Sequence, residues 1–128
     1  MIIDSSAILA IFFREPGAEE LLSMIVEAEF AGIGSPTAAE TGLVLTARLQ
    51  RNATGPLARF FEETGIEIVP FSDLHWQHAI DAYSRFGKGR HPAALNFGDC
   101  MTYATATLAS QPLLCRGNDF SRTDLELV

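Results

Sequence analysis

Short apolar runs alternate with longer segments of helical periodicity along the chain, and this alternation constrains the fold more than any other feature. Apolar runs that end at turn residues indicate strands, and apolar side chains that recur every three or four residues indicate helices. The expected strands are residues 1–3, 30–33, 66–69 and 112–115, with a further edge strand over 125–128. The expected helices are residues 5–13, 18–29, 38–50, 73–86 and 98–109, with one more through Leu57, Phe60 and Phe61. Strands that alternate with helices pair in parallel, so the sequence predicts an α/β fold with a mainly parallel central sheet flanked by helices.

Three of the expected helices carry an apolar face. Its side chains are Leu21, Leu22, Ile25 and Val26 in the second helix, Leu43, Val44 and Ala47 in the third, and Ala79, Ile80 and Tyr83 in the helix over 73–86. Residues 87–92 contain two glycines and a proline and are expected to form a loop.

The length of 128 residues and the 48% of hydrophobic residues fit one compact domain that spans residues 1–128. No segment approaches the ~20 apolar residues of a membrane span, and the first residues do not resemble a signal peptide. The simplest expectation is therefore a cytoplasmic protein without a membrane partner. Cys100 and Cys115 have no metal-ligand spacing and are expected to be buried thiols.

The net charge of −7 argues against a simple nucleic-acid-binding module, because the field of the whole protein repels phosphate. An acidic chain can still act on nucleic acid where a divalent ion neutralises an acidic site. A function on nucleic acid therefore has to rest on a specific site.

Four acidic residues follow expected strands or open expected helices. Asp4 ends the first strand, Asp119 lies just beyond the strand over 112–115, and Asp99 and Glu40 lie in the first turns of their helices. In a parallel sheet these positions share the carboxyl edge, where ligands bind. The sequence therefore predicts that the four carboxylates converge.

Carboxylates that crowd together repel one another and need a cation to remain ionised. Oxygen ligands of this kind suit Mg²⁺, with Mn²⁺ as an alternative. Such an ion can activate water and offset the charge of a phosphodiester, so the predicted chemistry is phosphodiester hydrolysis.

Each acid also has a purely local interpretation. Asp4 fits an N-cap, Asp99 a first-turn acid and Asp119 an ordinary turn residue. Thr37 to Glu40 fits a capping box, in which Glu40 only bonds the backbone. The residues alone leave both interpretations open.

The segments around the four acids resemble the motifs of the PIN-domain VapC toxins, in the same order and over essentially the whole chain. The matching segments are IIDSSA (2–7), SPTAAE (35–40), LNFGDC (95–100) and LLCRGNDF (113–120). The resemblance implies a magnesium-dependent endoribonuclease with Asp4, Glu40, Asp99 and Asp119 as catalytic acids, of which Asp4, Asp99 and Asp119 bind the metal. It also implies a homodimer that a VapB-type antitoxin neutralises.

Two further residues near the acids are candidates for orienting the metal ligands. Ser6 stands at the family's small hydroxyl position after the first aspartate, and we predict that it orients Asp4 or a metal-bound water. Its alternative is local bonding in a first helical turn. Asn118 adjoins Asp119, and either residue can fill the fourth acidic position; we assign that position to Asp119.

Basic residues cluster beside two of the acids. Arg85, Lys88 and Arg90 precede Asp99, and Arg116 precedes Asp119. They are candidate contacts for RNA phosphates, although a solvated loop without a partner would have the same composition.

The antitoxin is expected to bring a basic side chain to the acidic cluster and to cover apolar surface around Ile11, Phe12 and Leu43. Two other functions compete with a toxin ribonuclease. A phosphatase of the haloacid-dehalogenase type would use Asp4 as its nucleophile, but Ser6 stands where its second aspartate belongs. A PIN-like module that binds a protein without cleaving RNA is the non-enzymatic alternative.

Overall fold

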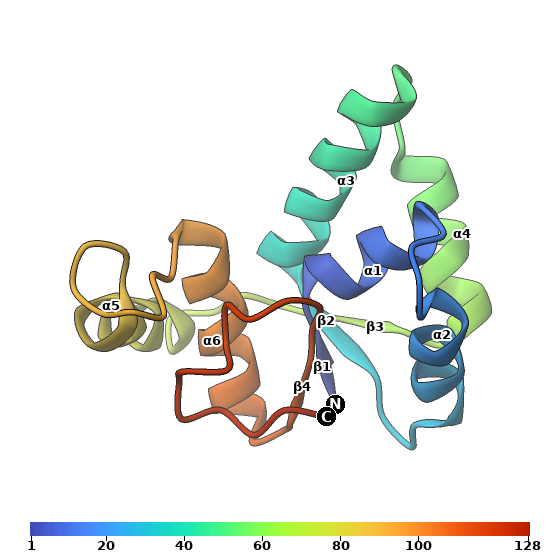
Figure 1. The fold of residues 1–128 in the computed structure, drawn as a ribbon. Coiled ribbons are helices and arrows are strands. Elements are labelled where there is room, and N and C mark those ends of the chain that lie inside the picture. The colour runs from blue at the N-terminus through green and yellow to red at the C-terminus, as the bar shows by residue number, and fades with distance from the viewer.

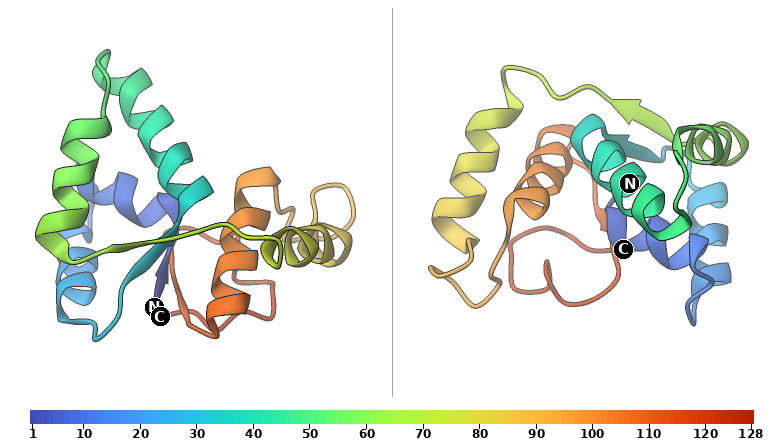
Figure 2. Two further views of the ribbon diagram at one scale, coloured as in Figure 1. Left: turned by 180° about the vertical axis from the view of Figure 1, so that it is seen from behind. Right: turned by 90° about the horizontal axis from the view of Figure 1, so that it is seen from above.

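The computed structural model describes all residues 1–128 and confirms the α/β prediction. The four strands are β1 (Ile2–Ile3), β2 (Gly32–Gly34), β3 (Glu67–Val69) and β4 (Leu113–Leu114). The six helices are α1 (Ser5–Phe12), α2 (Ala18–Glu27), α3 (Ser35–Leu49), α4 (Thr54–Thr64), α5 (His75–Phe86) and α6 (Phe97–Ala109). The strands form one parallel sheet in the order β3-β2-β1-β4. The helices α1 to α4 lie on one side of the sheet and α5 and α6 on the other (Figures 1 and 2).

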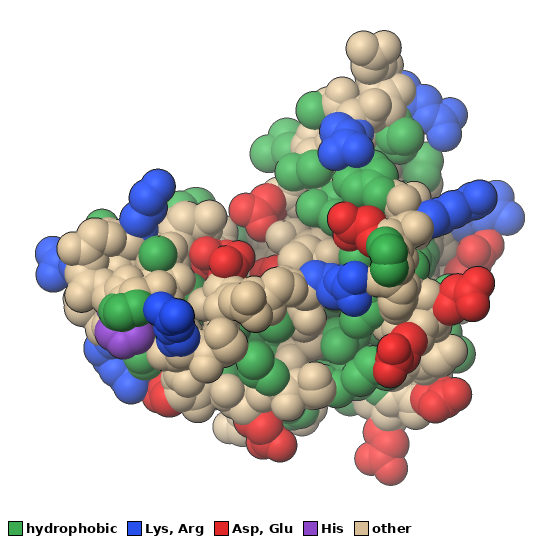
Figure 3. Space-filling model, viewed as in Figure 1, with side chains coloured by type: hydrophobic (Ala, Val, Ile, Leu, Met, Phe, Trp, Pro, Cys, Tyr) green, Lys and Arg blue, Asp and Glu red, His purple; other side chains and the backbone are tan.

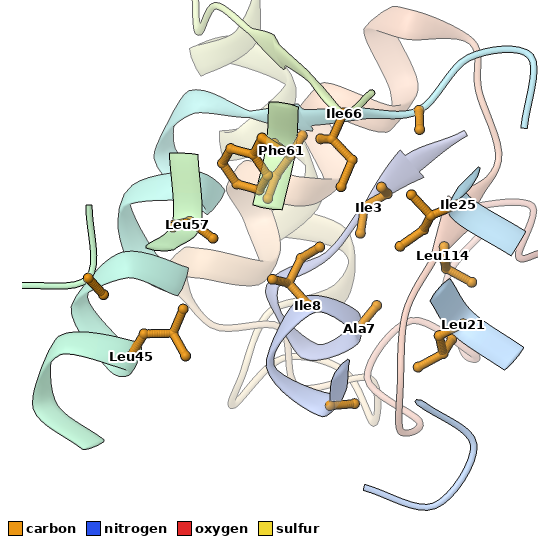
Figure 4. Close-up of a cluster of buried hydrophobic side chains, with 14 residues drawn as sticks. Ile3, Ala7, Ile8, Leu21, Ile25, Leu45, Leu57, Phe61, Ile66 and Leu114 are labelled. Carbon is orange, nitrogen blue, oxygen red and sulfur yellow. The ribbon is translucent and has the colours of Figure 1, made fainter. Parts of the chain in front are cut away.

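The buried side chains divide into two clusters because successive residues of a strand point to opposite faces of the sheet. Ile3 and Leu114 belong to the cluster that α1 to α4 cover, which Figure 4 shows in close-up. Ile2 and Leu113 belong to the cluster beneath α5 and α6. The two short strands β1 and β4 therefore each contribute to both cores, which accounts for the absence of polar residues in them.

The predicted apolar faces of the helices are only partly buried. Four of their side chains are exposed: Val26 (58%), Leu43 (72%), Ile80 (58%) and Tyr83 (43%). Helical spacing identifies an apolar face, but neighbouring helices cover only part of it. α3 begins at Ser35, so Thr37 lies inside the helix, and the capping box that was the local alternative for Glu40 does not form.

The C-terminal end of the chain also differs from expectation. Residues 125–128 form no strand, and Leu127 makes only a single bridge to Leu113.

Cys100 is buried as predicted, whereas Cys115 is only partly buried. None of the helices is long and apolar enough to cross a membrane.

Candidate active site

Asp4 lies at the carboxyl end of β1 and is held by three hydrogen bonds. As the N-cap of α1 it accepts at Oδ2 from the Ser6 backbone N–H (3.1 Å) and from Ser6 Oγ (2.6 Å). Its Oδ1 accepts from Thr102 Oγ1 at 2.9 Å. The side chain is thus both a helix cap and an oriented carboxylate, so the local interpretation and the site interpretation do not exclude each other.

Ser6 connects Asp4 to the loop that follows β4. While Ser6 Oγ donates to Asp4, it accepts a hydrogen bond of 2.9 Å from the Arg116 backbone N–H. The structure therefore places Ser6 against Asp4, the position expected of a residue that orients the carboxylate.

Asp99 lies in the first turn of α6, where it forms a capping box with Asn96. The Asp99 N–H donates to Asn96 Oδ1 (2.9 Å), and the Asn96 N–H donates to Asp99 Oδ2 (3.0 Å). Burial raises the pKa of the Asp99 carboxyl to about 6, the hydrogen bond from Asn96 opposes this rise, and the charges of Asp119, Asp4 and Glu40 add to it. The three other predicted acids therefore lie close enough to Asp99 to act on it electrostatically.

The Cys115 thiol gives an independent view of the same cluster. Burial raises its pKa to about 11, and the charges of Asp4, Asp119 and Asp99 contribute to the rise. The negative potential of these carboxylates thus extends over the end of β4.

Glu40 reaches the cluster because the facing helix carries no side chain opposite it. A Cβ atom added at Gly98 would overlap the Glu40 carboxylate, with Glu40 Cδ only 2.9 Å away. Glu40 is partly buried and forms no capping bond, which removes the purely local explanation for this acid.

Asp119 lies in the exposed turn after β4, and its charge is among those that raise the pKa of Asp99 and Cys115. Asn118 is also exposed, and its backbone carbonyl accepts from Ser121 Oγ at 2.8 Å. The charge that bears on the cluster from this turn is therefore that of Asp119, consistent with its assignment to the fourth acidic position.

The donor set fits a hard cation that keeps much of its water. All four side chains offer carboxylate oxygens, and their mutual repulsion favours a positive charge between them. No three His, Cys, Asp or Glu side chains are arranged to hold an ion directly. The arrangement therefore suits Mg²⁺ held by one or two carboxylates and water, rather than an ion enclosed by protein ligands.

The predicted phosphate contacts differ in their surroundings. Arg85 lies in an internal network: it pairs with Asp124 (2.9 Å) and Asp81 (3.4 Å) and donates to Tyr103 Oη (3.1 Å). Two carboxylates of the chain therefore share the charge of Arg85, which is exposed, and its role as a phosphate contact stays a prediction.

The other three basic residues are exposed and form no ion pair. Arg116 donates to the Pro16 carbonyl, and the Arg90 guanidinium lies 5.5 Å from the centre of the Tyr83 ring. In Figure 3, acidic side chains gather in the hollow between the α3–α4 pair and the α5–α6 pair, with basic side chains around it.

Two buried threonines of the site were missed by the sequence analysis. Thr102 contacts Asp4 directly, and Thr37 Oγ1 lies 3.1 Å from Thr102 Oγ1. Each lies three residues from an acid on the same helix, Thr102 after Asp99 and Thr37 before Glu40. This spacing was the only available signal, and it does not distinguish them from other helical threonines.

The chain is similar to known proteins in both sequence and fold. The sequence model of the PIN domain matches residues 1–126. VapC ribonuclease Mb2004c of Mycobacterium bovis and ribonuclease VapC36 of Mycobacterium tuberculosis are each 48% identical to this chain, over 98% of it and 91% of their own length. Among solved structures, the sarcin–ricin-loop-cleaving toxin VapC20 of M. tuberculosis has a TM-score of 0.77 at 17% identity, covering 99% of this chain and 97% of that one. VapBC2 of Rickettsia felis, bound to a promoter DNA fragment, has a TM-score of 0.76 at 15% identity, covering 99% and 96%.

Proposed function

The chain belongs to the PIN domain family, and from this premise we propose that it is a magnesium-dependent endoribonuclease, the toxin of a VapBC-type pair. The observation that carries the proposal is the convergence of Asp4, Glu40, Asp99 and Asp119 from four separate segments of the chain. The relatives named VapC ribonucleases support the reaction class. RNA in the cytoplasm is the expected substrate.

One or two of Asp4, Asp99 and Asp119 would hold the Mg²⁺ or Mn²⁺ ion directly and the others through its water molecules. The Glu40 carboxylate would add negative charge to the site. When bound, the ion supplies positive charge to the scissile phosphate and lowers the pKa of a bound water. Asp4 contributes a carboxylate that accepts hydrogen bonds from Ser6 and Thr102. The exposed Lys88, Arg90 and Arg116 would bind phosphates on either side of the cleaved bond.

Purified chain incubated with cellular RNA and Mg²⁺ tests this function. We expect cuts at recurrent positions, mapped as new 5′ ends, both in vitro and after brief induction in cells. An Asp4→Asn protein purified in the same way controls for contaminating nucleases. A chain that binds a partner protein but cleaves no RNA would instead support the silent binding module. The phosphatase alternative is not supported, since the residue two after Asp4 is Ser6, which bonds Asp4 and supplies no acid.

A VapB-type antitoxin is the proposed protein partner, and the solved toxin–antitoxin neighbours are consistent with it. The three residues predicted to form the docking surface for the antitoxin do not lie in one groove. Phe12 packs against Phe60 at 5.2 Å between ring centres, whereas Ile11 and Leu43 line separate grooves. Leu43, with Leu57, Phe61 and Ile68, lines a groove between α3 and α4. We expect Leu43→Glu to weaken co-purification with the antitoxin encoded beside the chain.

A homodimer is the proposed assembly. A groove between α5 and α6 is lined only by hydrophobic side chains, and Trp76 (51%), Ile80 (58%) and Phe97 (79%) are strongly exposed on it. Exposed apolar surface of this kind typically marks a protein interface, and a two-fold axis would bury the patch of each copy against the other. Light scattering should give twice the chain mass, and Trp76→Glu should give the single-chain mass.

Gly98→Ala is expected to lower cleavage while leaving the fold at least as stable. The new methyl group must displace the Glu40 carboxylate, because the two would overlap. Alanine also favours the helix by up to about 1 kcal/mol relative to glycine. We expect kcat/KM to fall by about tenfold, an amount typical of misplacing a group that supports a metal site.

Gly55→Ala is the matched control for this change. Gly55 is also the second residue of its helix, and nothing lies within 4 Å of a Cβ built there. It should gain similar stability and keep full activity. Equal activity of both variants would show that the position of Glu40 is unimportant.

Cation binding is expected to weaken as the pH falls through about 6. The pKa of Asp99 is raised to about 6, so the folded protein takes up a proton there before an unfolded chain does, and a protonated carboxyl competes with a cation. The Mn²⁺ association constant, measured by calorimetry, should be nearly constant above pH 7 and fall by about tenfold per pH unit below 6. A flat profile down to pH 5 would contradict this account.

A further inference from the structure

A chain of buried hydroxyl groups ends on Asp4. Thr102 is 1% exposed, Thr37 is 2% exposed and Asp4 is 5% exposed. An ionised carboxylate can only accept, so Thr102 Oγ1 donates its proton to Asp4 Oδ1. The hydroxyl of Thr102 is then an acceptor for that of Thr37, 3.1 Å away. The direction of both hydrogen bonds is therefore fixed, and each strengthens the other.

The two threonines join the elements that carry the acids. Thr37 belongs to α3, one turn before Glu40, and Thr102 belongs to α6, one turn after Asp99. Residues three apart on a helix lie on the same face. The hydroxyl pair thus connects the faces of α3 and α6 that carry Glu40 and Asp99, and fastens both to Asp4.

The hydrogen bonds of Asp4 leave a defined capacity for a further ligand. A carboxylate has about four acceptor positions, two on each oxygen. Oδ2 receives two donors, the N–H and the hydroxyl of Ser6. Oδ1 receives one, from Thr102. The remaining position is therefore on Oδ1.

We propose that Thr102, itself oriented by Thr37, is a positioning residue that presents Asp4 Oδ1 to the divalent cation. This inference rests on the proposed metal-dependent function. Thr102 acts through Asp4 and needs no contact with the ion or the RNA. A merely structural role, in which the hydroxyls only satisfy each other in the core, would affect stability but not cation affinity.

Thr102→Val tests the inference, because valine keeps the shape of threonine and removes the hydroxyl. The matched control is Thr105→Val on the same helix: Thr105 is also 1% exposed, but its hydroxyl bonds the Met101 carbonyl instead of Asp4. The measurements are the Mn²⁺ dissociation constant by calorimetry and the melting temperature without metal. Thr102→Val should weaken Mn²⁺ binding by about 10- to 100-fold, and Thr105→Val should leave it unchanged. Thr102→Ser should restore the affinity, and Thr37→Val should have a smaller effect of the same sign.

The outcomes separate this inference from the proposed function. If the parent protein binds Mn²⁺ and Thr102→Val binds it equally well, the positioning role is overturned and the nuclease proposal stands. If the parent binds no Mn²⁺, both are overturned. Should Thr102→Val fail to fold, Thr37→Val decides, because it removes the donor to Thr102 while leaving the bond to Asp4. An unchanged dissociation constant in folded Thr37→Val would then refute the inference.

Discussion

Asp4→Asn and Asp99→Asn are each expected to lower RNA cleavage by about two to three orders of magnitude or more, while the protein remains folded. Asparagine keeps the size of aspartate and removes the negative charge that would hold the cation. If these acids served only as helix caps, asparagine would replace them well, because it is an equally good capping residue. Initial rates of RNA cleavage at saturating Mg²⁺ distinguish the two accounts, and full activity of both variants would leave the carboxylate site without support.

The two substitutions should differ in their effect on stability. The pKa of Asp99 is raised to about 6, so the fold disfavours its ionised form. The resulting destabilisation is absent below pH 4, grows between pH 4 and 6, and is fully present at pH 8. Asp99→Asn should therefore melt at the same temperature as the parent at pH 4 and at an equal or higher temperature at pH 8.

Asp4→Asn should instead melt at a lower temperature at both pH values. Asparagine has an NH2 group in place of one carboxylate oxygen, and this group cannot accept a hydrogen bond. A donor of either Ser6 or Thr102 therefore loses its acceptor. A buried donor that loses its acceptor costs about 1–3 kcal/mol. Added Mg²⁺ should raise the melting temperature of both variants less than that of the parent, because a ligand stabilises a fold according to its affinity.

Removal of divalent metal is expected to abolish cleavage altogether. Four carboxylates without a cation repel the phosphate that they must approach, in a chain whose net charge is already −7. Cleavage by the purified chain should stop in excess EDTA and return when Mg²⁺ or Mn²⁺ is added beyond the chelator. Zn²⁺ should restore it poorly, since the site offers no His or Cys ligand set.

The control for this experiment is to measure whether the protein stays folded without metal. Circular dichroism and melting should show a folded protein in EDTA, because hydrogen bonds to Ser6 and Thr102 orient Asp4 without any ion. Cleavage that continues undiminished in EDTA would rule out the metal mechanism. Loss of the fold in EDTA would assign the ion a structural role instead.

The order of strands and helices could be predicted from the sequence because it depends on contacts between near neighbours. The apolar pair Ile2–Ile3 predicts a short strand buried on both faces, and the turn residues after it place Asp4 at the carboxyl edge of a parallel sheet. The same reasoning placed Asp99 at a helix start and Asp119 beyond the last strand. These local patterns therefore predict that the acids share one edge of the sheet, without any tertiary contact.

The tertiary structure decided which side chains meet, because this depends on the packing of residues far apart in the chain. Thr102 bonds Asp4 across 98 positions, and Glu40 enters the cluster only because Gly98 faces it from α6. The exposure of Leu43 and the pairing of Arg85 with Asp81 and Asp124 arise in the same way. Helical periodicity records which face of a helix is apolar, but only the neighbouring elements determine how much of that face is covered and which charges are paired.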